Sequence, residues 1–322
     1  MNELLSLKPC MLLTSNGKGE TVLHKVVAAR HKEAVIFELG RPSQLECACD
    51  LEAGAHSVHT QSVWLAGNNE NETTLHYAAK CGDAEIAGAL LEKVQGIAFI
   101  CNNAKEPPVY TACEEGHSDV AMKILHADSS ASVPDSRGDD RTCLHALIDL
   151  FSPVNKFLIE KKRNQIVENA KLLIIERKQL VEKADGSSNL PLHLATMYGE
   201  LQLVKKLVET NSETCYRVNN DGMASIYIAA QKGFVDIIKC LIGSSPDCIH
   251  VLGKENNNVL HFALENEHYR LALECVLQND DVDTSFLVKE GENEGNTPLH
   301  TFATQYRPRL FLRSVVFSRE HQ

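Results

Sequence analysis

The chain has 322 residues, of which 43% are hydrophobic and 23% charged, a composition that excludes disordered and collagen-like proteins. Its 32 basic and 43 acidic residues give a net charge of −11. This charge makes duplex DNA and anionic lipid poor candidate partners, because both are bound largely through cationic side chains. The eleven cysteines are an odd number and are scattered through apolar stretches, which indicates buried thiols in a reducing compartment.

The N-terminal stretch MNELLSLKPCMLL lacks the basic start of a signal peptide. No apolar run in the chain reaches the roughly 18 to 20 residues that a membrane helix needs. We therefore expect no direct membrane span in this chain and a cytoplasmic location.

Eight four-residue blocks that end in His or Tyr recur along the sequence, most of them about 34 residues apart. The blocks are Thr21–His24, Thr73–His76, Pro107–Tyr110, Thr142–His145, Leu190–His193, Ala224–Tyr227, Asn258–His261 and Thr297–His300. A polar stretch rich in Gly and Asn precedes each block, and a Gly-polar step followed by an apolar helical run comes after most of them. Each unit is therefore predicted to contain a turn, a short helix, a glycine break and a second helix.

The residue types of the block suit the start and end of a short helix. Threonine caps a helix or opens its first turn, and proline is tolerated at the first helical position. The alanine pair that follows, as in Ala78-Ala79, allows close helix packing, and glycines such as Gly82 allow a left-handed helix end. No such unit buries its apolar face alone, so stability is expected to come from stacking.

These blocks resemble the ankyrin repeat, whose T-P-L-H-x-A-A-x-x-G-H pattern is visible in pieces across residues 14–317. The resemblance implies an all-α ankyrin-repeat solenoid of about eight helix-turn-helix repeats with short hairpin loops. It also implies that the block histidines are scaffold residues that hydrogen-bond between neighbouring turns. We expect one array over residues 1–322, with repeats near 16–38, 68–94, 102–127, 137–160, 185–210, 219–243, 254–279 and 292–317.

Two insertions and an unusual last repeat depart from the pattern. The insertions lie at about 39–66 and 151–175, and each is either a binding element or a tolerated surface loop. The second has a basic start and helical periodicity, which predicts a lengthened outer helix. In the last repeat Pro308 falls where the second helix should begin. Either the arginines Arg309, Arg313 and Arg319 form the polar end that a terminal repeat needs, or the chain was cut from a longer one.

The first insertion contains a weak candidate zinc cluster. Its ligands would be Cys47, Cys49, His56 and His59, two thiols and two imidazoles within thirteen residues. The spacing is not that of a usual zinc finger, and the alternative is a loop with incidental cysteines and histidines.

The sequence carries no signal for an enzyme. It has no phosphate-binding loop, no dinucleotide fingerprint, no nucleophile elbow and no H-E-x-x-H motif. Six of the fourteen histidines belong to the repeat blocks, so they are not expected to be catalytic. We expect no catalytic residues, no cofactor and no small-molecule substrate.

By resemblance to ankyrin arrays, a partner protein would bind in the concave groove of hairpin tips and exposed inner-helix positions. Repeat phase predicts that these positions include Met197, Tyr198, Val218, Asn220, Met223, Gln231, Lys232, Glu265 and Asn266, with Glu114 and Glu115 in the third repeat. Met and Tyr at such positions favour an interface, since adaptable and aromatic side chains are enriched there. The alternative is that a few exposed apolar residues are ordinary.

Three segments of the chain resemble plant ankyrin proteins of the accelerated-cell-death type. They are Asp185–His193, Val218–Ala230 and Lys254–Ala263. That resemblance implies a non-enzymatic protein–protein interaction scaffold in defence or stress signalling. In those proteins a similar array precedes a C-terminal membrane domain, which this chain does not contain. An alternative is therefore the regulatory portion of a membrane signalling or channel-like protein, at the cytosolic face of a membrane.

Overall fold

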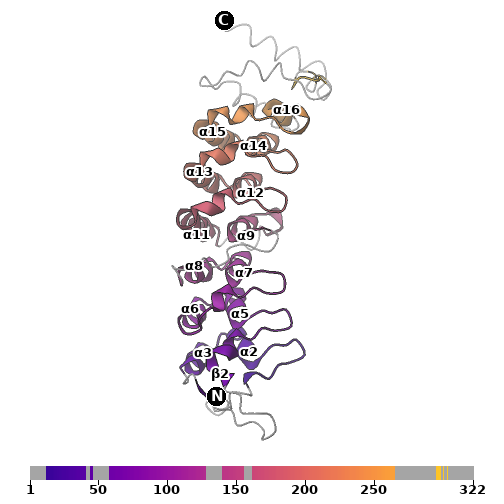
Figure 1. The fold of residues 1–322 in the computed structure, drawn as a ribbon. Helices are drawn as coiled ribbons and strands as arrows, with labels where there is room; N and C mark the ends of the chain where they lie inside the picture. The colour runs from indigo at the N-terminus through magenta and orange to yellow at the C-terminus, as the bar shows by residue number, and fades with distance from the viewer. Residues whose placement is uncertain are drawn as a thin grey trace. The chain divides into compact units, whose positions relative to one another are not determined.

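The computed structural model describes residues 12–40, 44–45, 58–127, 140–155, 162–264, 295–298, 300 and 303. Residue contacts divide the chain into two compact units, with Met1–Leu150 and Val154–Leu173 in unit 1, and Phe151–Pro153 and Ile174–Gln322 in unit 2. Within each unit, pairs of short helices stack on one another in chain order (Figure 1).

In unit 1 the first helix of each pair packs on the first helix of the next, forming an inner row from α2 through α5 and α7 to α9. The second helices form an outer row in the same way, from α3 through α6 to α8. The elements are α2 (Val22–Ala28), α3 (Lys32–Leu39), β1 (Gln44–Leu45), β2 (Val58–His59), α4 (Thr60–Leu65), α5 (Thr74–Cys81), α6 (Ala84–Lys93), η2 (Ile97–Phe99), α7 (Pro108–Glu114), α8 (Ser118–His126), α9 (Cys143–Asp149), η3 (Pro153–Asn155) and α11 (Arg163–Glu176), of which the last two cross the unit boundary.

Unit 2 repeats the arrangement with α12, α14 and α16 as its inner row and α13 and α15 as its outer row. Short 3-10 helices follow the outer helices and lead into the hairpins. The elements are η4 (Lys178–Glu182), α12 (Pro191–Met197), α13 (Leu201–Thr210), η5 (Ser212–Tyr216), α14 (Ser225–Lys232), α15 (Val235–Ser244), η6 (Pro246–His250), η7 (Lys254–Asn256) and α16 (Val259–Leu264).

The four-residue block begins each inner helix through a local hydrogen bond. The backbone N–H of the capping residue donates to Nδ1 of the block histidine, at 3.0 Å in Thr73–His76 and 3.0 Å in Leu190–His193. Because this bond uses the histidine ring rather than the capping side chain, Leu190 serves as well as threonine at the cap. The predicted helix start at each block is therefore confirmed for these repeats.

The opposite edge of the same imidazole joins one repeat to the next. Nε2 of His24 bonds the carbonyl oxygen of Glu72 at 2.9 Å, and Nε2 of His193 bonds the carbonyl oxygen of Arg217 at 3.1 Å. These histidines are fully buried, so each ring satisfies two backbone groups in the interior. The prediction that the block histidines are scaffold residues is confirmed for His24, His76, His193 and His261, each of which bonds a carbonyl oxygen of the next repeat.

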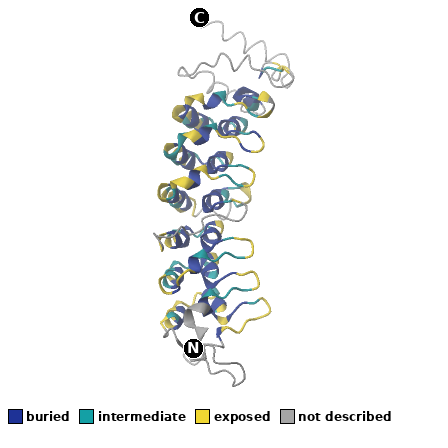
Figure 2. Cartoon of the chain, in the orientation of Figure 1, coloured by how far each residue is buried: buried dark blue, intermediate teal, exposed yellow. Residues whose placement is uncertain are grey.

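Close packing accounts for the small residues after the block. Ala78 and Ala79 are completely buried, and Gly82 ends α5 in the left-handed conformation at φ 69°. A Cβ atom on Gly82 would lie 2.4 Å from Nδ1 of His117, so both its conformation and its contact require glycine. In both units the buried side chains lie between the two helix rows, and the hairpin loops carry most of their exposed residues at their tips (Figure 2).

The two predicted insertions contain their own secondary structure. In the first, strands β1 and β2 pair antiparallel, with Gln44 opposite His59, and α4 follows directly. This strand pair was not expected in an all-α fold, although it is only two residues long on each side. In the second, α11 is 14 residues long and buries Ile166 and Ala170. The terminal arginines Arg309, Arg313 and Arg319 lie outside the described residues.

Candidate functional site

The candidate site is the surface of unit 2 formed by its hairpins and the exposed ends of its inner helices, which we call the hairpin face. Three large apolar side chains on it are exposed: Met197 at 37%, Val218 at 41% and Leu252 at 43%. Met197 is the last residue of α12, and Val218 opens the hairpin that leads into α14. Two of these three residues, Met197 and Val218, were predicted from the repeat phase.

Val218 and Leu252 occupy equivalent positions on hairpins that touch. Val218 pairs antiparallel with Ala224 across its hairpin, and Leu252 follows 34 residues later in the chain. The hairpins approach so closely that a Cβ atom on Gly222 would lie 2.6 Å from the backbone nitrogen of Lys254. Leu252 was not among the predicted interface residues, although the repeat spacing that placed Val218 also points to it.

The other predicted interface residues of unit 2 differ in exposure. Tyr198 caps the C-terminal end of α12 and is half-buried, as is Met223 at the base of the hairpin. Gln231 is half-buried and Lys232 is exposed in the last turn of α14. Glu265 and Asn266 lie outside the described residues, so their place on this face stays a prediction.

Asn220 has a structural role that the sequence analysis did not anticipate. Its backbone N–H donates to the carbonyl oxygen of Ser187 at 3.1 Å, and its side-chain Nδ2 donates to that of Gly186 at 3.4 Å. Its Oδ1 accepts a hydrogen bond from the Ser188 hydroxyl at 2.7 Å. Asn220 therefore joins its hairpin tip to the preceding one, and both ends of its amide are occupied.

We expect the substitution Asn220→Ala to destabilise unit 2 by about 1 to 2 kcal/mol, because it removes two side-chain hydrogen bonds between exposed loops. Urea denaturation followed by circular dichroism measures this change. The matched control is Asn211→Ala, which removes the caps of η5 but leaves the hairpin tips intact. Proteolysis at residues 185–189 should accelerate only in Asn220→Ala, and equal rates in both variants would contradict the tip-joining role.

The hairpin face of unit 1 is ionic rather than apolar. Glu20, which is almost fully buried, accepts from Nζ of Lys25 at 2.6 Å, Nδ2 of Asn16 at 2.7 Å and the hydroxyl of Tyr77 at 2.8 Å. These bonds, led by that from Lys25, lower the pKa of Glu20 to about 2. Burial and the bond to Glu20 raise the pKa of Tyr77 to about 12.

The same network extends into the next hairpin of unit 1. Nδ2 of Asn68 donates to both the Tyr77 hydroxyl and Oε2 of Glu72, each at 3.1 Å, and Lys80 forms an ion pair with Glu72. The charged groups at the hairpin bases of unit 1 are therefore satisfied within the protein. Unit 2 has the amide pair Asn219–Asn189 instead, at 2.8 Å, and its exposed side chains include the apolar Met197, Val218 and Leu252.

The structure gives little support to metal or nucleophilic chemistry in its described parts. No group of three or more His, Cys, Asp or Glu side chains is placed to hold a metal ion in the described residues. Of the candidate zinc ligands, His59 lies in β2, whereas Cys47, Cys49 and His56 lie outside that part of the chain, so this hypothesis is untested. Burial raises the pKa of the Cys215 thiol to about 11, which keeps it protonated and unreactive at neutral pH.

Stacked helix pairs with hairpins, glycine breaks and bridging histidines define an ankyrin-repeat fold. The family model for ankyrin repeats, in three copies, matches residues 157–251. Two solved ankyrin-repeat domains are similar in fold. That of Bcl-3, of the IκB protein family, has a TM-score of 0.59 and 17% identity, covering 81% of this chain and 99% of that one. That of human ASB11 has a TM-score of 0.54 and 16% identity, covering 80% and 98%.

Three curated relatives match parts of the chain. The nuclear factor NF-kappa-B p105 subunit of Gallus gallus is 25% identical over 70% of this chain and 24% of its own length. The poly [ADP-ribose] polymerase tankyrase of Caenorhabditis elegans is 26% identical over 92% and 13%. Protein ACCELERATED CELL DEATH 6 of Arabidopsis thaliana is 26% identical over 34% and 18%. The chain thus spans a quarter or less of the length of these relatives. Its likeness to Protein ACCELERATED CELL DEATH 6 agrees with the resemblance predicted from the sequence.

Within the described part of the chain, no helix combines the length and the apolar character that crossing a bilayer requires. The longest helix described with its own bounds, α11, has 14 residues and includes charged residues such as Arg163 and Lys171.

Proposed function

We propose that this chain is a non-enzymatic scaffold that binds another protein through the hairpin face of unit 2. The observation that carries the proposal is the exposure of Met197, Val218 and Leu252 on a face where the asparagines bond from one hairpin to the next. Ankyrin repeats are an architecture of protein–protein interaction, and apolar side chains raised on rigid elements are typical centres of such interfaces.

The contrast between the two units supports the choice of unit 2. In unit 1 the corresponding face is charged, with Glu20 and Glu72 neutralised by Lys25 and Lys80. Separating these ion pairs to seat an apolar partner would leave buried carboxylates without compensation. In unit 2 the apolar side chains lose only water on binding, so contact there is favourable.

Aspartate at Val218 and Leu252 should weaken partner binding at least about tenfold, because each change places a charge in the apolar contact. The partner is first identified by co-purification from native tissue. It is then purified, and its affinity is measured by calorimetry for the wild-type chain and for the double variant. Neither side chain is buried, so the fold should be unaffected.

Val154→Asp is the matched control, since Val154 is 89% exposed and belongs to η3 in unit 1 rather than to a hairpin of unit 2. It should bind the partner as the wild type does. Alanine at Met197, Tyr198 and Met223 tests the inner-helix side of the same face. If both the aspartate and the alanine variants bind the partner as tightly as the wild type, the hairpin face of unit 2 is not the binding site.

For the biological setting we propose defence or stress signalling, as in the plant ankyrin proteins that the sequence resembles. The support is the likeness to Protein ACCELERATED CELL DEATH 6, which extends over 34% of this chain. In the alternative, the chain is the cytosolic regulatory portion of a membrane signalling or channel-like protein. Fractionation of the native product separates the two, because only the alternative predicts a longer product in the membrane fraction.

We do not propose a polymerase activity for this chain, although the relative tankyrase is named as a poly [ADP-ribose] polymerase. The chain covers only 13% of that relative, and the likeness lies in a repeat array. Fold alone does not carry an activity from one protein to another.

A further inference from the structure

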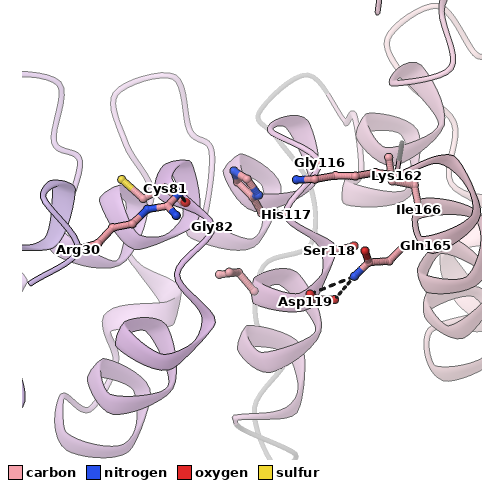
Figure 3. Close-up of a pocket in the computed structure, with 11 residues that line it drawn as sticks. Arg30, Cys81, Gly82, Gly116, His117, Ser118, Asp119, Lys162, Gln165 and Ile166 are labelled. Carbon is pink, nitrogen blue, oxygen red and sulfur yellow. Dashed lines mark hydrogen bonds between the residues drawn. The ribbon is translucent and has the colours of Figure 1, made fainter. Parts of the chain in front are cut away.

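Unit 1 contains a cavity of about 220 Å³ on the turns between its inner and outer helices. The lining comes from the turns after α2, α5 and α7, from the start of α8 and from the start of α11 (Figure 3). Three basic side chains line it: Arg30, His117 and Lys162. No part of the hairpin face of unit 2 contributes to it.

The two permanent cations have unused hydrogen-bonding capacity. Arg30 donates to the carbonyl oxygen of Cys81 through one terminal nitrogen, which leaves the remaining N–H groups of its guanidinium available. The ammonium of Lys162 makes no hydrogen bond or ion pair to any residue that the structure describes. It extends from the start of α11 toward Gly116 and His117 (Figure 3).

The imidazole of His117 lies between these cations, with Nε2 bonded to the carbonyl oxygen of Lys80 at 3.1 Å. Burial first, and then the charge of Lys162, lower the pKa of His117, and Arg30 acts in the same direction. The bond to Lys80 and the charge of Glu115 oppose them. The ring is therefore neutral at pH 7 in an electropositive cavity.

The one carboxylate in the lining is already engaged. Both oxygens of Asp119 accept from Nε2 of Gln165, at 2.9 and 3.1 Å (Figure 3). This contact occupies both oxygens of the carboxylate. Among the described residues, no other carboxylate lines the cavity beside Arg30, His117 and Lys162, and Glu115 acts on His117 only from outside the lining.

We propose that this cavity binds a phosphoryl group, held between the guanidinium of Arg30 and the ammonium of Lys162. A guanidinium matches two phosphate oxygens at once, and lysine adds a mobile point charge. A volume of about 220 Å³ is below the range for larger organic ligands, so a small tetrahedral anion is the appropriate size. The group comes either from free phosphate or from a phosphorylated side chain of a partner, which share this chemistry.

The test uses the whole chain, with histidine labelled for NMR and the His117 signals assigned through His117→Asn. Inorganic phosphate and the N-acetyl N-methylamide of phosphoserine are titrated separately at constant ionic strength. The unphosphorylated serine derivative and chloride serve as blanks. We expect a saturable shift of the His117 ring signals with a phosphorylated ligand and an increase in the pKa of His117 on binding.

Lys162→Gln should weaken binding about tenfold, since it removes one charge-assisted contact. Lys183→Gln is the control, because Lys183 is an equally exposed lysine of unit 2 and should leave the affinity unchanged. Tighter binding of the phosphoserine derivative assigns the site to a phosphorylated chain, and equal binding assigns it to free phosphate. A His117 signal that does not saturate, or equal affinities for wild type and Lys162→Gln, overturns the proposal but leaves the hairpin face untouched.

Discussion

Replacing His193 by leucine should lower the free energy of unfolding of unit 2 by roughly 3 to 4 kcal/mol. The ring accepts from the N–H of Leu190 at 3.0 Å and bonds the carbonyl oxygen of Arg217 at 3.1 Å. His193 is completely buried, so leucine leaves both backbone groups inside the protein without partners. Each unsatisfied group costs about 1 to 3 kcal/mol, which is more than the apolar surface of leucine returns.

Urea denaturation followed by circular dichroism measures the loss. The control is His31→Leu, because His31 is exposed at the start of α3 and is not a block histidine. Trp64, the single tryptophan, is buried in unit 1 and reports separately on that unit through its fluorescence. A destabilisation below about 1 kcal/mol would show that water or a shift of the hairpin replaces the histidine bonds.

The repeat could be predicted from the sequence because its determinants are local. A cap, a histidine three residues later and a glycine at the helix end lie within about ten residues, and each acts on the backbone of its own helix. The bond from His193 to Arg217 crosses to the next repeat, yet the fixed repeat length makes even this contact periodic. The helix pairs and the buried histidines therefore followed from the pattern alone.

Features that depend on pairing between different repeats could not be read in the same way. The network of Glu20 joins residues as far apart as Tyr77, and no spacing rule relates a glutamate in one hairpin to a tyrosine in the next helix. Asn220 was predicted to face a partner because it lies at a hairpin tip. Its amide instead bonds the preceding tip, which is visible only when the hairpins are stacked.

The predicted interface depends on which side chains are exposed, and the position of a residue within the repeat determines its exposure only approximately. Met197 and Val218 have the exposed positions expected for them, while Tyr198 and Met223 are half-buried. The cationic cavity was not foreseen either, since Arg30 and His117 come from two different repeats and Lys162 lies within the second insertion. Their meeting is a consequence of stacking rather than of any local motif.

Mild acid should destabilise unit 1 through its buried histidines. Burial is the main cause that lowers the pKa of His24 and of His76 below the ordinary value of 6.5, and it outweighs the bonds to the carbonyl oxygens of Glu72 and Glu106. The nearby charges of Glu72 oppose the shift, and Lys25 and Lys80 favour it. The folded protein consequently holds both rings neutral at a pH where the unfolded chain has begun to protonate them.

The sign of the effect follows from proton uptake. Below the unfolded pKa the unfolded chain binds more protons than the folded protein, so stability falls as the pH falls toward the folded pKa values. Each histidine contributes a slope of at most about 1.4 kcal/mol per pH unit, so the stability of unit 1 should fall measurably between pH 7 and pH 5.5. Glu20, with its pKa lowered from 4.5 to about 2, contributes no loss until the pH falls below about 4.5.

Urea denaturation at a series of pH values, followed by the fluorescence of Trp64, measures this slope in unit 1. His76→Gln keeps a polar side chain that does not titrate, so it should reduce the slope between pH 7 and pH 5.5, while His24 and His117 keep their contributions. His31→Gln removes an exposed imidazole and should leave the slope as in the wild type. A stability that is flat across this range, or a slope that His76→Gln does not change, would show that the buried rings are protonated in the folded protein. The second loss, below pH 4.5, should persist in both variants because it arises from Glu20 and its bonds to Lys25, Asn16 and Tyr77.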